Sequence, residues 1–250
     1  MTKLALKTLS MKIPFKIGNT HVTAEVLQRG EPTPTMLNVH DDENTSVAAG
    51  QVIIEQSGGR LITLAHSGTR QVRFTVEGER YAFDPNRIFS DTGIRQTLAA
   101  ESRWSELAHH AVKKFAARYL EHFGLDREPV VIALHNTVDG TYSVRSYLPG
   151  AEHAPAAAAV HLSERRSKFD FFYTTDPRFL EYLKKRDFNV VLQDHAAVPD
   201  DGSLSVHFAK MGIPYVNIEA EMGHLNAQID MVRAVREMLD ELGVLRPKGQ

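Results

Sequence analysis

The chain has 250 residues, of which 42% are hydrophobic and 24% are charged, as is typical of a folded globular protein. The formal net charge of −2 provides no long-range attraction to nucleic acid or to an anionic membrane surface. There is no cysteine, which excludes disulfides, thiolate nucleophiles and Cys-type zinc sites, whereas 12 histidines allow a metal site built from His and carboxylate.

The N-terminal segment is interrupted by four lysines and contains no apolar run of signal-peptide length: Lys3, Lys7, Lys12 and Lys16. No stretch of about 18 successive apolar residues occurs, so we expect no membrane-spanning helix. These features predict a cytoplasmic protein without a membrane or nucleic-acid partner. They do not indicate an oligomeric state.

Apolar and polar residues alternate on both sides of Gly18-Asn19, which predicts a hairpin over about residues 11–28. Apolar runs predict strands over 36–39, 61–65, 71–76, 80–83, 129–134, 189–192 and 214–218. Amphipathic segments predict helices over 46–56, 90–100, 105–123, 177–185, 203–211 and 224–242. Residues 144–148 fit one more strand, and the Ala-rich segment 154–159 fits no element.

The alternation of strands and helices predicts a single α/β domain over residues 1–250, with a mixed, mainly parallel sheet and helices on both faces. Ligands of such sheets bind beyond the carboxyl ends of the strands. Three polar residues stand at the ends of apolar runs: His40, His135 and Glu219. We therefore expect them to lie near one another.

Glu43 follows His40 by three positions at a predicted strand-to-helix turn, a spacing that lets an imidazole and a carboxylate converge on a metal. His161 and Glu164 have the same spacing, which is common between solvated neighbours. The spacing alone therefore identifies neither pair as ligands.

The ordered motifs resemble the zinc carboxypeptidase superfamily, and more closely its aspartoacylase and succinylglutamate desuccinylase branch. A His-x-x-Glu at His40 and Glu43 precedes the segment Asp84-Pro85-Asn86-Arg87, and a lone His135 and the late Glu219 follow. The resemblance extends from about residue 36 to residue 225. The pair of His161 and Glu164 has no such segment after it and is set aside.

The resemblance implies one zinc ion per chain, held by His40, Glu43 and His135 with water in the fourth position. It makes Asp84 an acceptor for a ligand imidazole, although an Asp before Pro85 is also typical of a simple turn.

The resemblance also implies that Asn86 and Arg87 bind a substrate carboxylate, which a planar guanidinium matches better than lysine does. Arg80 would polarise the scissile carbonyl; its spacing differs by one residue from that of the family, and a surface arginine is the alternative.

The general base is either Glu219 or Glu221. Strand alternation places both on one face of the predicted strand, opposite Val216, Ile218 and Ala220. Glu219 follows an apolar residue at the strand end, as the family's catalytic Glu usually does, and we favour it. Glu221 stays open because Glu221-Met222-Gly223 has the Glu-x-Gly form common in the desuccinylase-like enzymes.

These expectations indicate a zinc-dependent hydrolase that cleaves an amide or peptide bond next to a free carboxylate. A carboxypeptidase acting on short peptides, with cell-wall peptides as one candidate class, is the first interpretation. An N-acyl amino acid deacylase is the alternative. It stands second because Asp41-Asp42 occupies the place where that branch commonly has Gly and Asn. A catalytically silent binding protein of the same fold, or an unrelated α/β domain, would also fit.

Overall fold

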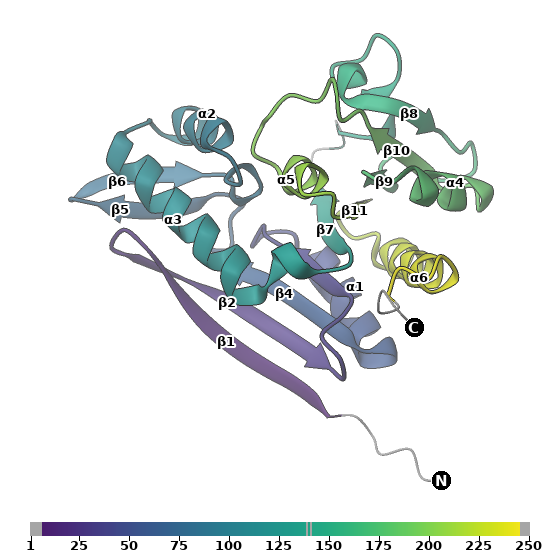
Figure 1. Cartoon of the computed structure of the whole chain (residues 1–250), viewed down its shortest axis with the longest axis horizontal. Coiled ribbons are helices and arrows are strands. Elements are labelled where there is room, and N and C mark those ends of the chain that lie inside the picture. The colour runs from purple at the N-terminus through teal and green to yellow at the C-terminus, as the bar shows by residue number, and fades with distance from the viewer. Residues whose placement is uncertain (1–6, 139, 141, 246–250) are drawn as a thin grey trace.

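Nine strands form one sheet through the centre of the molecule (Figure 1). The computed structural model describes residues 7–138, 140 and 142–245. In spatial order the strands are β1 (Thr8–Ile17), β2 (Thr20–Arg29), β4 (Gly59–Ala65), β3 (Thr35–Asn38), β7 (Val131–Thr137), β11 (Tyr215–Glu221), β9 (Phe171–Thr174), β10 (Asn189–Gln193) and β8 (Ala157–His161). A separate two-stranded sheet pairs β5 (Val72–Val76) with β6 (Glu79–Phe83).

The predicted mixed sheet is confirmed, and its parallel part is the centre. The parallel pairs are β4 with β3, β3 with β7, β7 with β11, and β9 with β10. The other four neighbouring pairs are antiparallel, including the hairpin of β1 and β2 that turns at Gly18. Parallel pairs are thus half of the sheet and not most of it, because β1, β2 and β4 alternate in direction at one edge, while β9 is antiparallel to β11 and β8 is antiparallel to β10 near the other.

Helices cover both faces of the sheet. One face carries α1 (Asn44–Ser57), α4 (Pro177–Lys185) and α6 (Leu225–Glu241), and the other carries α2 (Asp91–Glu101), α3 (Glu106–Phe123) and α5 (Leu204–Lys210). Strand alternation produces the two cores. In β7, for example, Val131 and Ala133 enter the core under α3, while Ile132 and Leu134 enter the core under α1 and α6.

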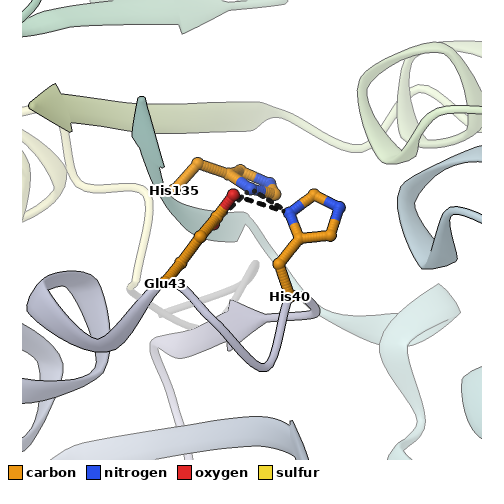
Figure 2. Close-up of side chains that lie close together, drawn as sticks. All are labelled: His40, Glu43 and His135. Atoms are coloured by element: carbon orange, nitrogen blue, oxygen red, sulfur yellow. Dashed lines mark hydrogen bonds and ion pairs between the residues drawn. The ribbon is translucent and has the colours of Figure 1, made fainter. Parts of the chain in front are cut away.

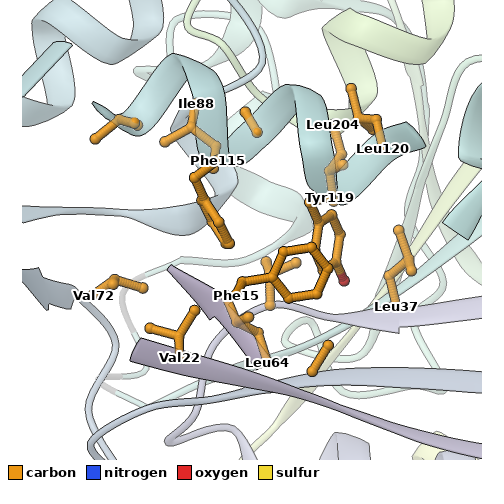
Figure 3. Close-up of a cluster of buried hydrophobic side chains, with 14 of the residues drawn as sticks. Phe15, Val22, Leu37, Leu64, Val72, Ile88, Phe115, Tyr119, Leu120 and Leu204 are labelled. Atoms are coloured by element: carbon orange, nitrogen blue, oxygen red, sulfur yellow. The ribbon is translucent and has the colours of Figure 1, made fainter. Parts of the chain in front are cut away.

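Aromatic side chains fill the core between α3 and the β1–β2 hairpin (Figure 3). The ring of Phe15 lies 5.9 Å from that of Phe115 and 5.8 Å from that of Tyr119. The helix begins where the Ser105 hydroxyl accepts a hydrogen bond from the Ala108 amide, and it ends at Gly124 in the left-handed conformation. The capping residues and the apolar stripe therefore fix the length of α3 and the face it buries.

The structure differs from the sequence-based expectation in three segments. Residues 144–147 form a 3₁₀ helix, not a strand, because Ser143 and Ser146 form a capping box. The unassigned Ala-rich segment contains a 3₁₀ turn over Ala154–Ala156 and then β8, and the short strand β9 was not predicted. Among the described helices, none is long and apolar enough to cross a membrane.

Candidate metal centre

Three buried side chains, His40, Glu43 and His135, point toward one another in the middle of the molecule (Figure 2). His40 Nδ1 lies 2.8 Å from Glu43 Oε1, His135 Nδ1 lies 3.0 Å from Glu43 Oε2, and the two Nδ1 atoms are 3.1 Å apart. A tetrahedral zinc ion with bonds of about 2.0–2.1 Å has ligand-to-ligand edges of roughly 3.3 Å. Small adjustments would therefore let these three atoms hold one metal ion.

The sheet brings the two histidines together from distant parts of the sequence. β3 pairs in parallel with β7, with Leu37 beside Ala133, so the chain after β3 emerges at the same edge as His135. His135 does not end its strand, because β7 continues to Thr137. Glu43 precedes α1, and its amide donates to the His40 carbonyl at 3.3 Å. This tight turn presents Glu43 beside His40.

Asp84 contacts a candidate ligand imidazole and also shapes the turn that follows it. Its Oδ1 lies 2.8 Å from Nε2 of His40, which turns Nδ1 of that ring toward Glu43. The same oxygen accepts a hydrogen bond from the Asn86 amide at 2.7 Å and so caps the 3₁₀ turn Pro85–Arg87. One carboxylate thus orients an imidazole and shapes the segment that follows it.

The electrostatics of the group reflect burial opposed by close pairing. Burial lowers the pKa of His40, but the carboxylates of Glu43 and Asp84 outweigh it and raise the pKa to about 9. Burial raises the pKa of Glu43, yet His40 and His135 outweigh it and hold that pKa well below its usual range. Burial lowers the pKa of His135. Without a metal, these shifts favour the charged forms of His40 and Glu43 and the neutral form of His135.

Arg70 is the charged neighbour that the sequence analysis missed. Its Nη1 donates to Glu43 Oε1 at 2.9 Å, and its Nη2 lies 3.3 Å from Asp84 Oδ2. Arg80, the residue expected here, stands on the exposed side of β6 opposite Thr75 and does not line the pocket. The structure therefore places Arg70, and not Arg80, beside the candidate metal ligands. No local pattern marks Arg70, because the loop after β4 brings it to the site.

A pocket of about 470 Å³ opens beside the three side chains. Its wall contains two cationic groups, Arg70 and Arg87, and the carboxylates of Glu43 and Glu219. The rest of the lining is largely aromatic and polar, and includes Asn86, Asn136, Tyr142, Tyr147, His153, Tyr173, Asp201, Tyr215 and Asn217. A small molecule that enters this pocket meets both signs of charge next to the candidate metal ligands.

Asn86 and Arg87 line the pocket, as expected of groups that bind a carboxylate. The amide oxygen of Asn86 accepts a hydrogen bond from the Leu204 amide at 3.1 Å, which fixes the side chain against the start of α5. Arg87 Nε lies 3.6 Å from Asp201 Oδ2, a residue that the sequence analysis did not single out. Asp201 therefore stands beside the guanidinium that a substrate carboxylate would need.

The two candidate bases on β11 have different surroundings. Glu219 aligns with His135 across the parallel pair of β7 and β11, is 5% exposed and lines the pocket. Burial, followed by the negative charge of Glu43, raises the pKa of Glu219 to about 8. Glu221 ends the strand outside the pocket, with its Oε2 3.5 Å from Nε2 of His224. Glu219 alone of the two is placed to exchange a proton with a molecule in the pocket.

The second pair of the same spacing does not form a comparable group. His161 Nε2 lies 3.4 Å from Asp187 Oδ1, and Glu164 is exposed. Among the described residues, the only group of three His, Asp or Glu with the required convergence is His40, Glu43 and His135.

No protein-family model and no curated protein sequence matches this chain. Among solved structures, thrombin activatable fibrinolysis inhibitor (TAFI) matches with a TM-score of 0.53 and 12% identity, over 97% of this chain and 70% of that protein. The fold of this chain is therefore similar to that of TAFI, at an identity that shows the fold alone. The resemblance predicted from the motifs is thereby confirmed at the level of the fold.

Two further structures match at a TM-score of 0.43. An aspartoacylase family protein from Mesorhizobium loti is 13% identical, over 98% of this chain and 69% of its own. The murein-tripeptide amidase MpaA from Escherichia coli O157 is 11% identical, over 88% of this chain and 84% of its own.

Proposed function

We propose that this protein is a zinc-dependent hydrolase that cleaves an amide or peptide bond next to a free carboxylate. The observation that carries the proposal is the buried convergence of His40, Glu43 and His135 on the wall of a pocket that also holds Arg87 and Glu219. Two imidazoles and one carboxylate are a donor set that suits zinc with an open coordination position.

The side chains present fit such an ion in two respects. Both histidines direct Nδ1 at the shared point, and the opposite nitrogen of His40 is held by Asp84, which is the usual partner of a ligating imidazole. The pair of neutral imidazoles would also leave the ion a net positive charge. Zinc bound there supplies a Lewis acid that polarises a carbonyl and lowers the pKa of water to about 7.

The residues around the group divide the remaining work. Arg87 presents a planar fork that binds the substrate carboxylate, with Asn86 beside it. Arg70 donates to the oxygen of the scissile carbonyl, because its guanidinium lines the pocket beside Glu43, one of the candidate metal ligands. Glu219 takes a proton from the attacking water and passes it to the leaving amine. Burial raises the pKa of Glu219, which makes its carboxylate a stronger proton acceptor.

The carboxypeptidase and the N-acyl amino acid deacylase would use these residues in the same way, because both substrates have an amide beside a free carboxylate. A catalytically silent relative would keep the metal and the carboxylate site without turnover. The three differ in which compounds are hydrolysed.

The test measures zinc content and hydrolysis with the same set of variants. We expect about one zinc ion per chain, lost in His40→Ala, Glu43→Ala and His135→Ala and retained in the matched control His161→Ala. A panel of N-acyl amino acids and short peptides, each with a free and an amidated carboxyl end, then identifies the substrate class. Protein that holds no zinc after growth with added zinc would refute the proposal, and zinc without any turnover would assign the silent relative.

A further inference from the structure

The loop of residues 66–71, between β4 and β5, directs three backbone amides at one carboxylate outside the pocket. The backbone amides of His66, Ser67 and Gly68 donate to the same oxygen, Oδ2 of Asp41, at 2.7, 2.7 and 2.6 Å. Three successive N–H groups aimed at one anion form a nest, which requires a left-handed residue. Gly68 supplies it, with φ +65°.

This anchor holds the part of the loop that is most open to solvent. Ser67 and Gly68 are exposed, and no atom lies within 4 Å of the position where a Cβ would stand on Gly68. Apart from the contacts that Arg70 makes with Glu43 and Asp84, the other polar contacts of the loop are local, such as the 2.8 Å hydrogen bond between the hydroxyls of Ser67 and Thr69. Hydrogen bonds to a charged acceptor are roughly twice as strong as neutral ones. The Asp41 carboxylate therefore sets the path of the loop.

The loop delivers Arg70 to the candidate metal centre. Arg70 follows the third anchored amide by two residues, and its guanidinium contacts Glu43 and Asp84. Asp41 belongs to the turn that contains His40 and Glu43. The same turn thus presents two candidate ligands inward and holds the arginine loop from the other side.

We infer that Asp41 is a positioning residue, which acts through the loop of residues 66–71 to hold Arg70 against Glu43. Its effect on catalysis rests on the proposed function, whereas its effect on the loop does not. The carboxylate does not enter the pocket and has no contact with a bound substrate to lose. Its removal should therefore change the position of Arg70 and leave the carboxylate site at Arg87 intact.

The first arm of the test measures backbone amide exchange in metal-free protein. In the Asp41→Ala variant we expect the amides of residues 66–68 to exchange at least about tenfold faster than in the wild type. Asp41→Asn keeps an acceptor oxygen and should restore part of the protection. Asp42→Ala removes the same charge from the adjacent position, and it should leave these three amides as they are. Unchanged protection in both Asp41 variants would overturn the inference.

The second arm is a double-mutant cycle with Arg70 in the zinc-loaded enzyme. We expect Asp41→Ala to lower kcat by about tenfold, with zinc content and KM little changed. In an Arg70→Ala background the same substitution should have no further effect. Losses that multiply would show that Asp41 does not act through Arg70.

The two arms separate the inference from the proposed function. If the wild type has no hydrolytic activity, the proposed function fails, and the exchange rates still decide whether Asp41 orders the loop. If Asp41→Ala does not fold, Asp41→Asn carries both arms, with smaller changes in the same direction.

Discussion

Replacing Glu219 with glutamine tests the electrostatics of the pocket directly. The side chain is 5% exposed, and its carboxylate accepts a hydrogen bond from Asn217 Nδ2 at 3.2 Å. Burial, with a further contribution from Glu43, raises its pKa from 4.5 to about 8. Glutamine keeps the size of the side chain and an acceptor oxygen but carries no charge at any pH.

The sign of the effect on stability follows from the raised pKa. The folded state binds this proton more tightly than the unfolded state, so the contribution of Glu219 to wild-type stability declines as pH rises from about 4.5 to about 8. At about 1.4 kcal/mol for each pH unit, the loss from this group is at most roughly 5 kcal/mol. Glu219→Gln does not titrate. We therefore expect it to be more stable than the wild type above pH 8, by about 2 to 5 kcal/mol.

The assay is urea unfolding of metal-free protein at a series of pH values from 5 to 9. The free energy of unfolding of Glu219→Gln, minus that of the wild type, should increase across this range and then level off. Glu221→Gln is the matched control, since Glu221 ends the same strand and is partly exposed. Wild-type and Glu219→Gln curves that run parallel would refute the reasoning.

The same variant separates the two candidate bases in the zinc-loaded enzyme. Glu219→Gln should lower kcat by about 10²- to 10⁴-fold, with zinc content and KM little changed, because it cannot accept a proton. Glu221→Gln should lower kcat by about tenfold or less. The opposite ranking would move the role of general base to Glu221.

Three further predictions concern the metal and the carboxylate site. Glu43 and Asp84 outweigh burial and raise the pKa of His40 to about 9, so the proton of His40 must leave before zinc binds. Zinc affinity, measured by competition with a chelator, should therefore rise about tenfold for each pH unit up to about pH 9. An affinity independent of pH would contradict this. Arg87→Lys should lower kcat/KM for substrates with a free carboxylate by an amount equivalent to roughly 1.5 to 3 kcal/mol of transition-state binding, and should barely affect amidated substrates. Equal losses of kcat/KM on both kinds of substrate would show that Arg87 does not bind the carboxylate. Asp201→Asn removes the anion 3.6 Å from Arg87 and should lower KM for the carboxylate substrate by a few-fold, a result that an unchanged KM would exclude.

Local sequence patterns determined most of the elements. The helix α4 has the predicted bounds, because the Asp176 carboxylate accepts from the Arg178 amide and Pro177 starts the first turn. The apolar run before His135 became a fully buried central strand. The ordered motif of His40, Glu43, Asp84 and His135 was also visible in the sequence. These residues come together because the strands and turns that carry them end at one edge of the sheet.

The tertiary structure alone decided which charged groups meet. Arg80 lies on the exposed face of the local hairpin of β5 and β6, whereas the loop after β4 brings Arg70 against Glu43 and Asp84, which are distant in the sequence. Glu219 and Glu221 share one face by alternation, and only the register of β11 against β7 shows that Glu219 aligns with His135. Strand periodicity reports which face a side chain occupies, whereas its neighbours depend on register and on the path of loops between distant segments.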